Sequence, residues 1–118
     1  MVRSFVGAML AVAGLAAPAL ADWTASPQSM GLAGQVGQGF PYQCPPTGAV
    51  SQVIWGSGHY TSDSAICPAA VHAGRIDVAP GGVVSVVVTG PQTAYGGISR
   101  FGVTSNAYGA WDQSYGFR

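Results

Sequence analysis

Hydrophobic and polar positions alternate in the first part of the chain that has a clear pattern. Phe40, Tyr42 and Cys44 are separated by Pro41 and Gln43. A period of two predicts a short strand, because successive side chains of a strand point to opposite faces of a sheet. Proline cannot donate a ladder hydrogen bond, so Pro41 places this strand at the edge of its sheet.

Residues 83–89 have the strongest strand pattern in the sequence, with valines on both faces and Ser85 as the one polar break. The other predicted strands are short and lie between glycine and proline turns: residues 50–55, 76–79 and 114–117, and parts of the Gly- and Ser-rich stretch 95–108. Several short strands in sequence order favour antiparallel pairing.

Residues 62–74 have a helical pattern instead. Their apolar side chains cover nearly the whole circumference, which is typical of a buried helix. Ser62 or Asp63 is expected to cap the start and Gly74 to end the helix. Pro68 is tolerated only near a helix start, so the regular helix is expected to begin late in this stretch. One helix among antiparallel strands predicts an α+β fold.

The N-terminus has the pattern of a secretory signal peptide. Arg3 precedes an apolar stretch that ends in Ala19–Ala21, a cleavage pattern followed by Asp22. We therefore expect a signal peptide at residues 1–21, an irregular N-terminal segment at 22–37 and the domain at 38–118. This organisation predicts a periplasmic or secreted protein, of bacterial type, with no transmembrane segment after cleavage. The alternative is an uncleaved N-terminal anchor.

Charge is scarce throughout the chain. Four arginines balance four aspartates, and neither lysine nor glutamate occurs. After the predicted cleavage, only Arg75, Arg100 and Arg118 remain as scattered cations. Nucleic acid and a basic membrane-surface helix both require a dense basic surface, so neither is expected as a partner or an element.

The two cysteines, Cys44 and Cys67, both lie in the part predicted to be exported. An even number of cysteines in an oxidising compartment predicts a disulfide. The alternative is a pair of free thiols, one of them catalytic.

Residues that could act as nucleophiles, bases or metal ligands are few, and their spacing does not suit catalysis. Along a helix, Ser64 and His72 would stand roughly 12 Å apart, too far for a nucleophile and its base. His59 and Asp63 would supply only two metal ligands. We therefore predict no enzyme, catalytic residue, metal or cofactor, and expect His72 to be a neutral core histidine bonded to backbone or a hydroxyl.

Residues 60–74, YTSDSAICPAAVHAG, resemble the signature of the LCCL domain. The family pattern runs Y-x-x-x-S-x-x-C-x-A-A-x-H-x-G, and further matches follow in order. The matching positions are Tyr60, Ser64, Cys67, Ala69, Ala70, His72 and Gly74, then Gly81–Val84, Tyr95, Gly102–Ser105, Trp111 and Ser114, with Cys44–Pro45 at the start. The resemblance extends over residues 38–118.

The resemblance implies an α+β domain with one central buried helix wrapped by short antiparallel β-strands. It also implies a disulfide between Cys44 and Cys67. The family motif, including Gly102 and Ser105, is expected to be mainly structural. Phe101 departs from the pattern, because the family usually has asparagine before the Gly-Val pair.

LCCL domains are accessory modules of extracellular proteins, which implies an exported, non-catalytic binding module. We expect it to recognise an envelope glycan, lipid or other surface component. The alternative is a structural or protein-interaction subunit of an envelope assembly. Aromatic side chains suit ligand contact on a surface with little charge. The candidates for such contact are Trp55, Tyr60, Tyr95, Tyr108, Trp111 and Tyr115.

Overall fold

The computed structural model describes residues 22–118, so the predicted signal peptide lies outside the described part of the chain. Eight elements follow one another in it. They are β2 (Gly39–Cys44), β3 (Gly56–Ser57), β4 (His59–Thr61), α2 (Ile66–His72), β5 (Gly82–Thr89), β6 (Ser99–Arg100), β7 (Val103–Thr104) and β8 (Ser114–Phe117). One helix among antiparallel strands confirms the α+β prediction.

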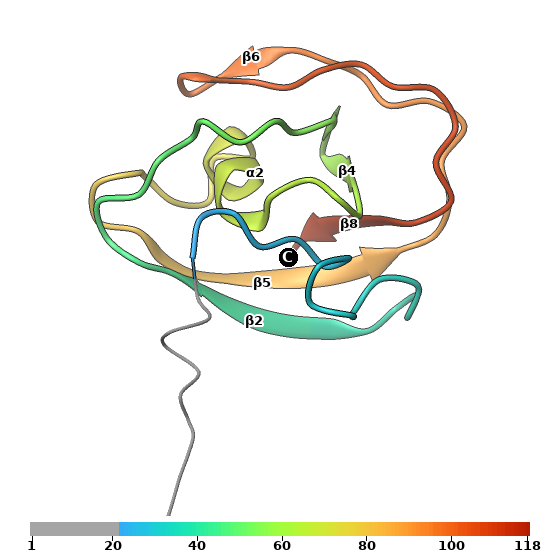
Figure 1. Cartoon of the computed structure of the whole chain (residues 1–118), viewed down its shortest axis with the longest axis horizontal. Coiled ribbons are helices and arrows are strands. Elements are labelled where there is room, and N and C mark those ends of the chain that lie inside the picture. Colours follow the sequence, from blue (N-terminus) through green and yellow to red (C-terminus); the bar gives the residue numbers. More distant parts are fainter. Residues whose placement is uncertain (1–21) are drawn as a thin grey trace, which may run out of the picture.

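Five of the strands form one sheet in the order β2-β5-β8-β4-β3, in which every neighbouring pair is antiparallel. In the view of Figure 1, β2, β5 and β8 lie below α2 and β4 lies beside it, with β2 and β5 as the long strands of the sheet. β2 is an edge strand, as Pro41 predicted. The alternation along β5 also holds, since Val84, Val86 and Val88 are buried while Val83 and Ser85 are exposed.

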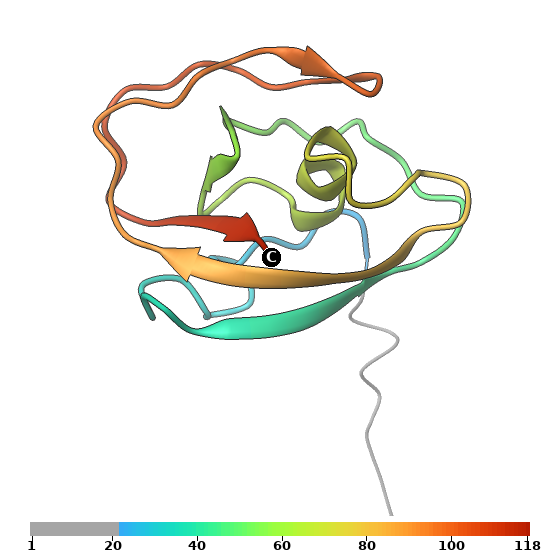
Figure 2. The ribbon, with the colours of Figure 1, turned by 180° about the vertical axis from the view of Figure 1, so that it is seen from behind.

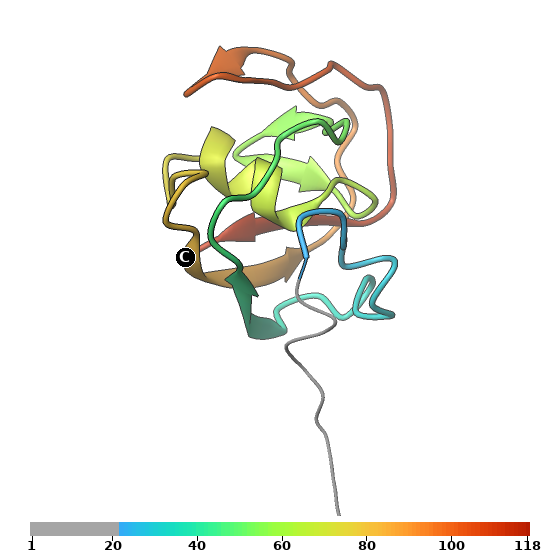
Figure 3. The same ribbon diagram turned by 60° about the vertical axis from the view of Figure 1, so that its left-hand side comes forward.

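Beyond β5 and β8 the same two chain segments continue as one long hairpin, residues 90–113. Single bridges join Gln92 to Trp111 and Tyr95 to Tyr108, and the β6–β7 pair forms the tip. The hairpin folds back over the helix, on the side away from β2 and β5 (Figures 2 and 3). The helix is therefore enclosed between the sheet and the hairpin.

All seven residues of α2 are buried, as its apolar circumference predicted. The expected cap is wrong: Ala65 is the N-cap residue and no side chain caps the helix. Asp63 instead accepts a hydrogen bond from the Thr61 hydroxyl. The Ile66 N–H donates to the Ala25 carbonyl, so a distant segment takes the place of a local cap. Pro68 lies in the first turn, where proline is tolerated.

The helix ends at a glycine, as predicted. Gly74 has φ of 76°, and its N–H donates to the Val71 carbonyl while the Arg75 N–H reaches the Ala70 carbonyl. This pair of bonds is a Schellman motif, in which the residue at the left-handed position is usually glycine. The turn aims Arg75 at the end of β8.

Two predicted strands are absent from the described residues. In the segment 50–55 only Trp55 makes a ladder contact, a single bridge to Asn106, and in 76–79 only Asp77 does, with Gly81. Ile54 is fully buried but Val53 is 52% exposed. Ile54, Ile76 and Val78 instead pack in or against the core from loops, because no neighbouring strand pairs with these segments.

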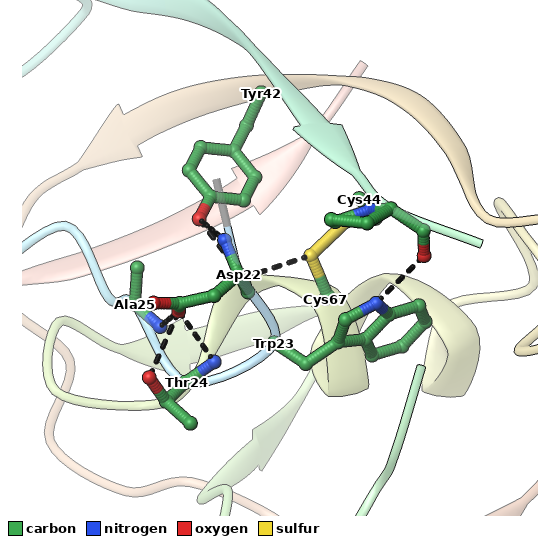
Figure 4. Close-up of a disulfide and its surroundings, with 8 residues drawn as sticks. Asp22, Trp23, Thr24, Ala25, Tyr42, Cys44 and Cys67 are labelled. Atoms are coloured by element: carbon green, nitrogen blue, oxygen red, sulfur yellow. Dashed lines mark hydrogen bonds between the residues drawn. A yellow bond between two sulfur atoms is a disulfide. The ribbon is translucent and has the colours of Figure 1, made fainter. Parts of the chain in front are cut away.

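Residues 22–37 contain no helix or strand, and the first part of this segment, residues 22–27, packs on the core. Trp23 is buried in the hydrophobic core, and its Nε1–H donates to the Pro45 carbonyl at 2.8 Å (Figure 4). The Tyr42 hydroxyl donates to the Asp22 carbonyl at 2.9 Å and accepts from the Asp22 N–H at 2.8 Å. The domain boundary at residue 38 stays a prediction.

The disulfide joins Cys44, at the end of β2, to Cys67 in the first turn of α2. Figure 4 shows it next to Asp22 and Trp23. Both cysteines are buried, and the Cys67 Sγ lies 3.6 Å from the Asp22 carbonyl oxygen. The cross-link therefore ties the edge strand to the central helix, as the family resemblance implied.

Candidate functional site

His72 lies at the centre of the molecule and connects three elements. Its Nε2 is 2.9 Å from the Ile98 carbonyl oxygen in the hairpin, and its Nδ1 is 2.9 Å from the Tyr60 hydroxyl of β4. A carbonyl can only accept, so Nε2 carries the proton and, in the neutral ring, Nδ1 accepts from Tyr60. The expected kinds of partner, a backbone group and a hydroxyl, are both present, and no local pattern in the sequence indicated that Tyr60 supplies the hydroxyl.

Ser64 ties the loop before α2 to the sheet. Its Oγ accepts from the Trp55 N–H at 2.9 Å and lies 2.7 Å from the Thr61 hydroxyl. The Ser64 carbonyl accepts from the Tyr115 hydroxyl at 2.7 Å. Ser64 and His72 thus have separate partners, and Ser64 has the environment of a structural residue.

The remaining residues of the family motif have structural positions too. Ala69 and Ala70 are fully buried, and their small side chains let the helix lie close to its neighbours. The Ser105 Oγ accepts from the Ile98 N–H at 3.1 Å and donates to its carbonyl at 3.2 Å. Gly102, with φ of 80°, forms the hairpin turn.

Three aromatic side chains form a cluster on one side of the molecule, which we call the aromatic cluster: Trp55, Tyr108 and Trp111. The Tyr108 ring centroid lies 6.4 Å from that of Trp55 and 5.7 Å from that of Trp111, both edge to face. Tyr108 is 44% exposed, and both tryptophans are half-buried. Residues about fifty positions apart in sequence therefore present one aromatic surface.

Beside the aromatic cluster lies an open groove of about 510 Å³. Its lining residues come from both strands of the hairpin: Pro91, Gln92, Thr93, Ala110, Trp111 and Asp112. Trp111 belongs to both the cluster and the groove, and its Nε1–H donates to the Ser62 hydroxyl at 3.0 Å. That hydrogen bond holds the indole between the cluster and the groove. The polar side chains of Gln92, Thr93 and Asp112 also line the groove.

Three of the aromatic candidates for ligand contact are buried and belong to the core. Tyr60 and Tyr115 are fully buried, and Tyr95 is 4% exposed. The Tyr95 hydroxyl is bonded to the Ser114 hydroxyl and donates to the Trp111 carbonyl at 3.2 Å. In strands this short, the alternation of apolar and polar residues does not show whether a tyrosine faces the core or the surface.

Burial raises the pKa of Tyr60 above its usual value, while the Gly58 N–H and the guanidinium groups of Arg100 and Arg75 act in the opposite direction. Burial also raises the pKa of Tyr115 well above its usual value. Both hydroxyls are therefore neutral donors at physiological pH. Both side chains are fully buried, and neither belongs to the aromatic cluster.

The fold does not assemble the titratable side chains considered for metal binding. The Nδ1 of His59 lies 3.4 Å from the Thr89 hydroxyl, whereas Asp63 is bonded to Thr61. Within residues 22–118, no three His, Cys, Asp or Glu side chains are grouped as metal ligands would be. In the same range, no helix is long and apolar enough to span a membrane.

A family model for the LCCL domain matches residues 21–115. The chain belongs to the LCCL domain family. This assignment confirms the resemblance read from the signature around α2. LCCL domains are non-enzymatic binding modules and are typically extracellular. A comparison with curated proteins found no match.

Proposed function

We propose that this LCCL domain is an exported, non-catalytic module that binds a neutral glycan of the cell envelope at the aromatic cluster. The observation that carries the proposal is the grouping of Trp55, Tyr108 and Trp111 beside an open groove. Export is supported by the signal-like residues 1–21, which lie outside the described part, and by the disulfide.

The chemistry of the surface favours a sugar over a charged ligand. Aromatic rings offer flat apolar faces with a polar tip, which can contact the C–H faces of a pyranose ring. Gln92 and Thr93 line the groove and can exchange hydrogen bonds with sugar hydroxyls. The only charged side chain among the lining residues is Asp112, so a polyanion would gain no Coulomb attraction here.

Oligosaccharide binding by the oxidised protein, lacking residues 1–21, tests this proposal. We would screen neutral oligosaccharides and peptidoglycan fragments at physiological salt, and measure any hit by titration calorimetry. Tyr108→Ala is the informative variant, because the ring is exposed and its loss leaves the core intact. We expect its Kd to rise about tenfold, since one ring contact is worth about 1 kcal/mol or slightly more.

Two control variants separate stacking from other effects. Tyr108→Phe keeps the ring and should bind like the parent if the aromatic face makes the contact. Val83→Ala changes an exposed apolar residue on β5 and should leave Kd unchanged. A folded protein that binds no sugar would refute the proposal. Concentration-dependent self-association or a protein partner would then favour the structural-subunit alternative.

A further inference from the structure

Two of the three arginines, Arg75 and Arg100, line one cavity at the C-terminal end of β8. The Arg75 guanidinium donates from Nη1 to the main-chain oxygen of Arg118 and from Nη2 to the Phe117 carbonyl at 3.3 Å. These bonds hold the Arg75 side chain across the end of the strand. An arginine has five N–H donors, so others remain for a ligand.

A cavity of about 140 Å³ lies at this point. Its lining residues come from four different parts of the fold: Gly58, Tyr60, Ala73, Arg75, Arg100 and Phe117. Arg75 follows α2 and Arg100 ends β6, so only the folding of the hairpin over the helix brings both cations to one cavity. No carboxylate side chain lies among its lining residues.

Two cationic side chains, Arg75 and Arg100, line the cavity. Both guanidinium groups lower the pKa of Tyr60, which places each of them close enough to act on the same phenol. The Arg100 Cζ is 6.0 Å from the Phe101 ring centroid, a cation–π contact that orients this side chain. Two guanidinium groups that line one cavity, with no Asp or Glu side chain among its lining residues, are typical partners of an oxyanion.

We propose that this cavity binds a phosphate group between Arg75 and Arg100. The group can belong to free inorganic phosphate or to a lipid headgroup, since the chemistry that binds it is the same. The site shares no residue with the aromatic cluster or its groove, so the inference does not depend on glycan binding. It would give the domain a second, anionic point of recognition.

Titration of the protein with inorganic phosphate at constant ionic strength tests the site. Amide and guanidinium NMR signals give the location, and we expect saturable shifts at Gly58, Arg75 and Arg100. Arg100→Gln should weaken binding by about tenfold, the loss expected for a charge-assisted hydrogen bond. Arg100 is exposed at the hairpin tip, so this variant should keep the parent fold.

Arg118→Gln is the matched control, because it removes the same charge nearby. The Arg118 side chain is not among the lining residues and extends toward Gly39 of β2. Its loss should change phosphate affinity by less than about twofold. Equal losses in both variants, shifts elsewhere, or no saturable shift at Gly58 and Arg100 would overturn the proposal.

Vesicle sedimentation distinguishes the two sources of the phosphate group. We would compare vesicles of phosphatidylcholine with vesicles that also contain phosphatidic acid. Binding to the second kind alone, inhibited by phosphate and lost in Arg100→Gln, assigns the site to a lipid headgroup. Phosphate binding without vesicle binding supports the site and assigns it to a soluble phosphate. Tyr108→Ala should leave both assays unchanged, which separates this site from the glycan surface.

Discussion

Loss of the cross-link between Cys44 and Cys67 should destabilise the domain strongly. The two cysteines are 23 residues apart in sequence. Closing a loop of this length removes chain entropy from the unfolded state worth about 3 kcal/mol. A chain of this size has an unfolding entropy of about 0.2 kcal/mol per kelvin, so Tm should fall by roughly 10–20 °C on reduction.

Thermal unfolding followed by tryptophan fluorescence, with and without reductant, measures this loss. The reduced protein keeps both sulfur atoms, so it isolates the cross-link. A Cys44→Ala/Cys67→Ala variant should be less stable again by about 1–2 kcal/mol, because both side chains are buried and their removal leaves space in the core. Amide exchange should rise first in β2, the edge strand that the cross-link holds to α2.

Two outcomes would refute this reasoning. Equal Tm values for oxidised and fully reduced protein, with reduction verified by mass spectrometry, would show that the cross-link contributes nothing. Free thiols in the purified, folded protein would show that the two cysteines are not paired. In either case, the stability of the domain would have to come from the core around α2 alone.

Three further predictions concern single side chains. His72→Leu should lower the free energy of unfolding by about 2 kcal/mol, because the buried Tyr60 hydroxyl loses its acceptor. A double-mutant cycle with Tyr60→Phe, measured by urea unfolding, should show a coupling of about 1 kcal/mol, and additive losses would contradict the hydrogen bond. Tyr60 and Tyr115 have raised pKa values in the folded state, so the stability they contribute is present below pH ~10 and is lost as pH rises further, by about 1.4 kcal/mol per pH unit per tyrosine. Above that pH, the free energy of unfolding of Tyr115→Phe should therefore fall less steeply with pH than that of the parent. Phe101 has φ of 51° in the hairpin turn, so Phe101→Asn should raise Tm by a few degrees, and an unchanged or lower Tm would contradict strain there.

The local patterns that predicted structure correctly are those in which neighbouring residues decide the outcome. β2 follows its alternation, β5 and β8 form where strands were predicted, Gly74 ends α2, and the apolar circumference of α2 matches its burial. The segments that failed, 50–55 and 76–79, have equally apolar residues. They lack a strand beside them, and a strand needs a partner that local sequence does not specify.

From the sequence, an aromatic surface could be predicted, but not which aromatic side chains form it. The sequence indicated that exposed aromatics would carry recognition, and it named Trp55, Tyr108 and Trp111 among six candidates. It could not separate them from Tyr60, Tyr95 and Tyr115, because side-chain exposure depends on which face each short strand presents. The Tyr60–His72 bond and the shared cavity of Arg75 and Arg100 left no local signal at all.

By itself, then, the sequence determined the family, the α+β class, the central buried helix and the scarcity of charged residues. These follow from composition, from local periodicity and from the ordered motif around Cys67 and His72. Only the tertiary structure decided that residues 22–27 pack on the core, and which surfaces the hairpin of residues 90–113 creates. The physical reason is that these features depend on contacts between segments far apart in the chain, which form when burying apolar area outweighs the entropy of bringing them together.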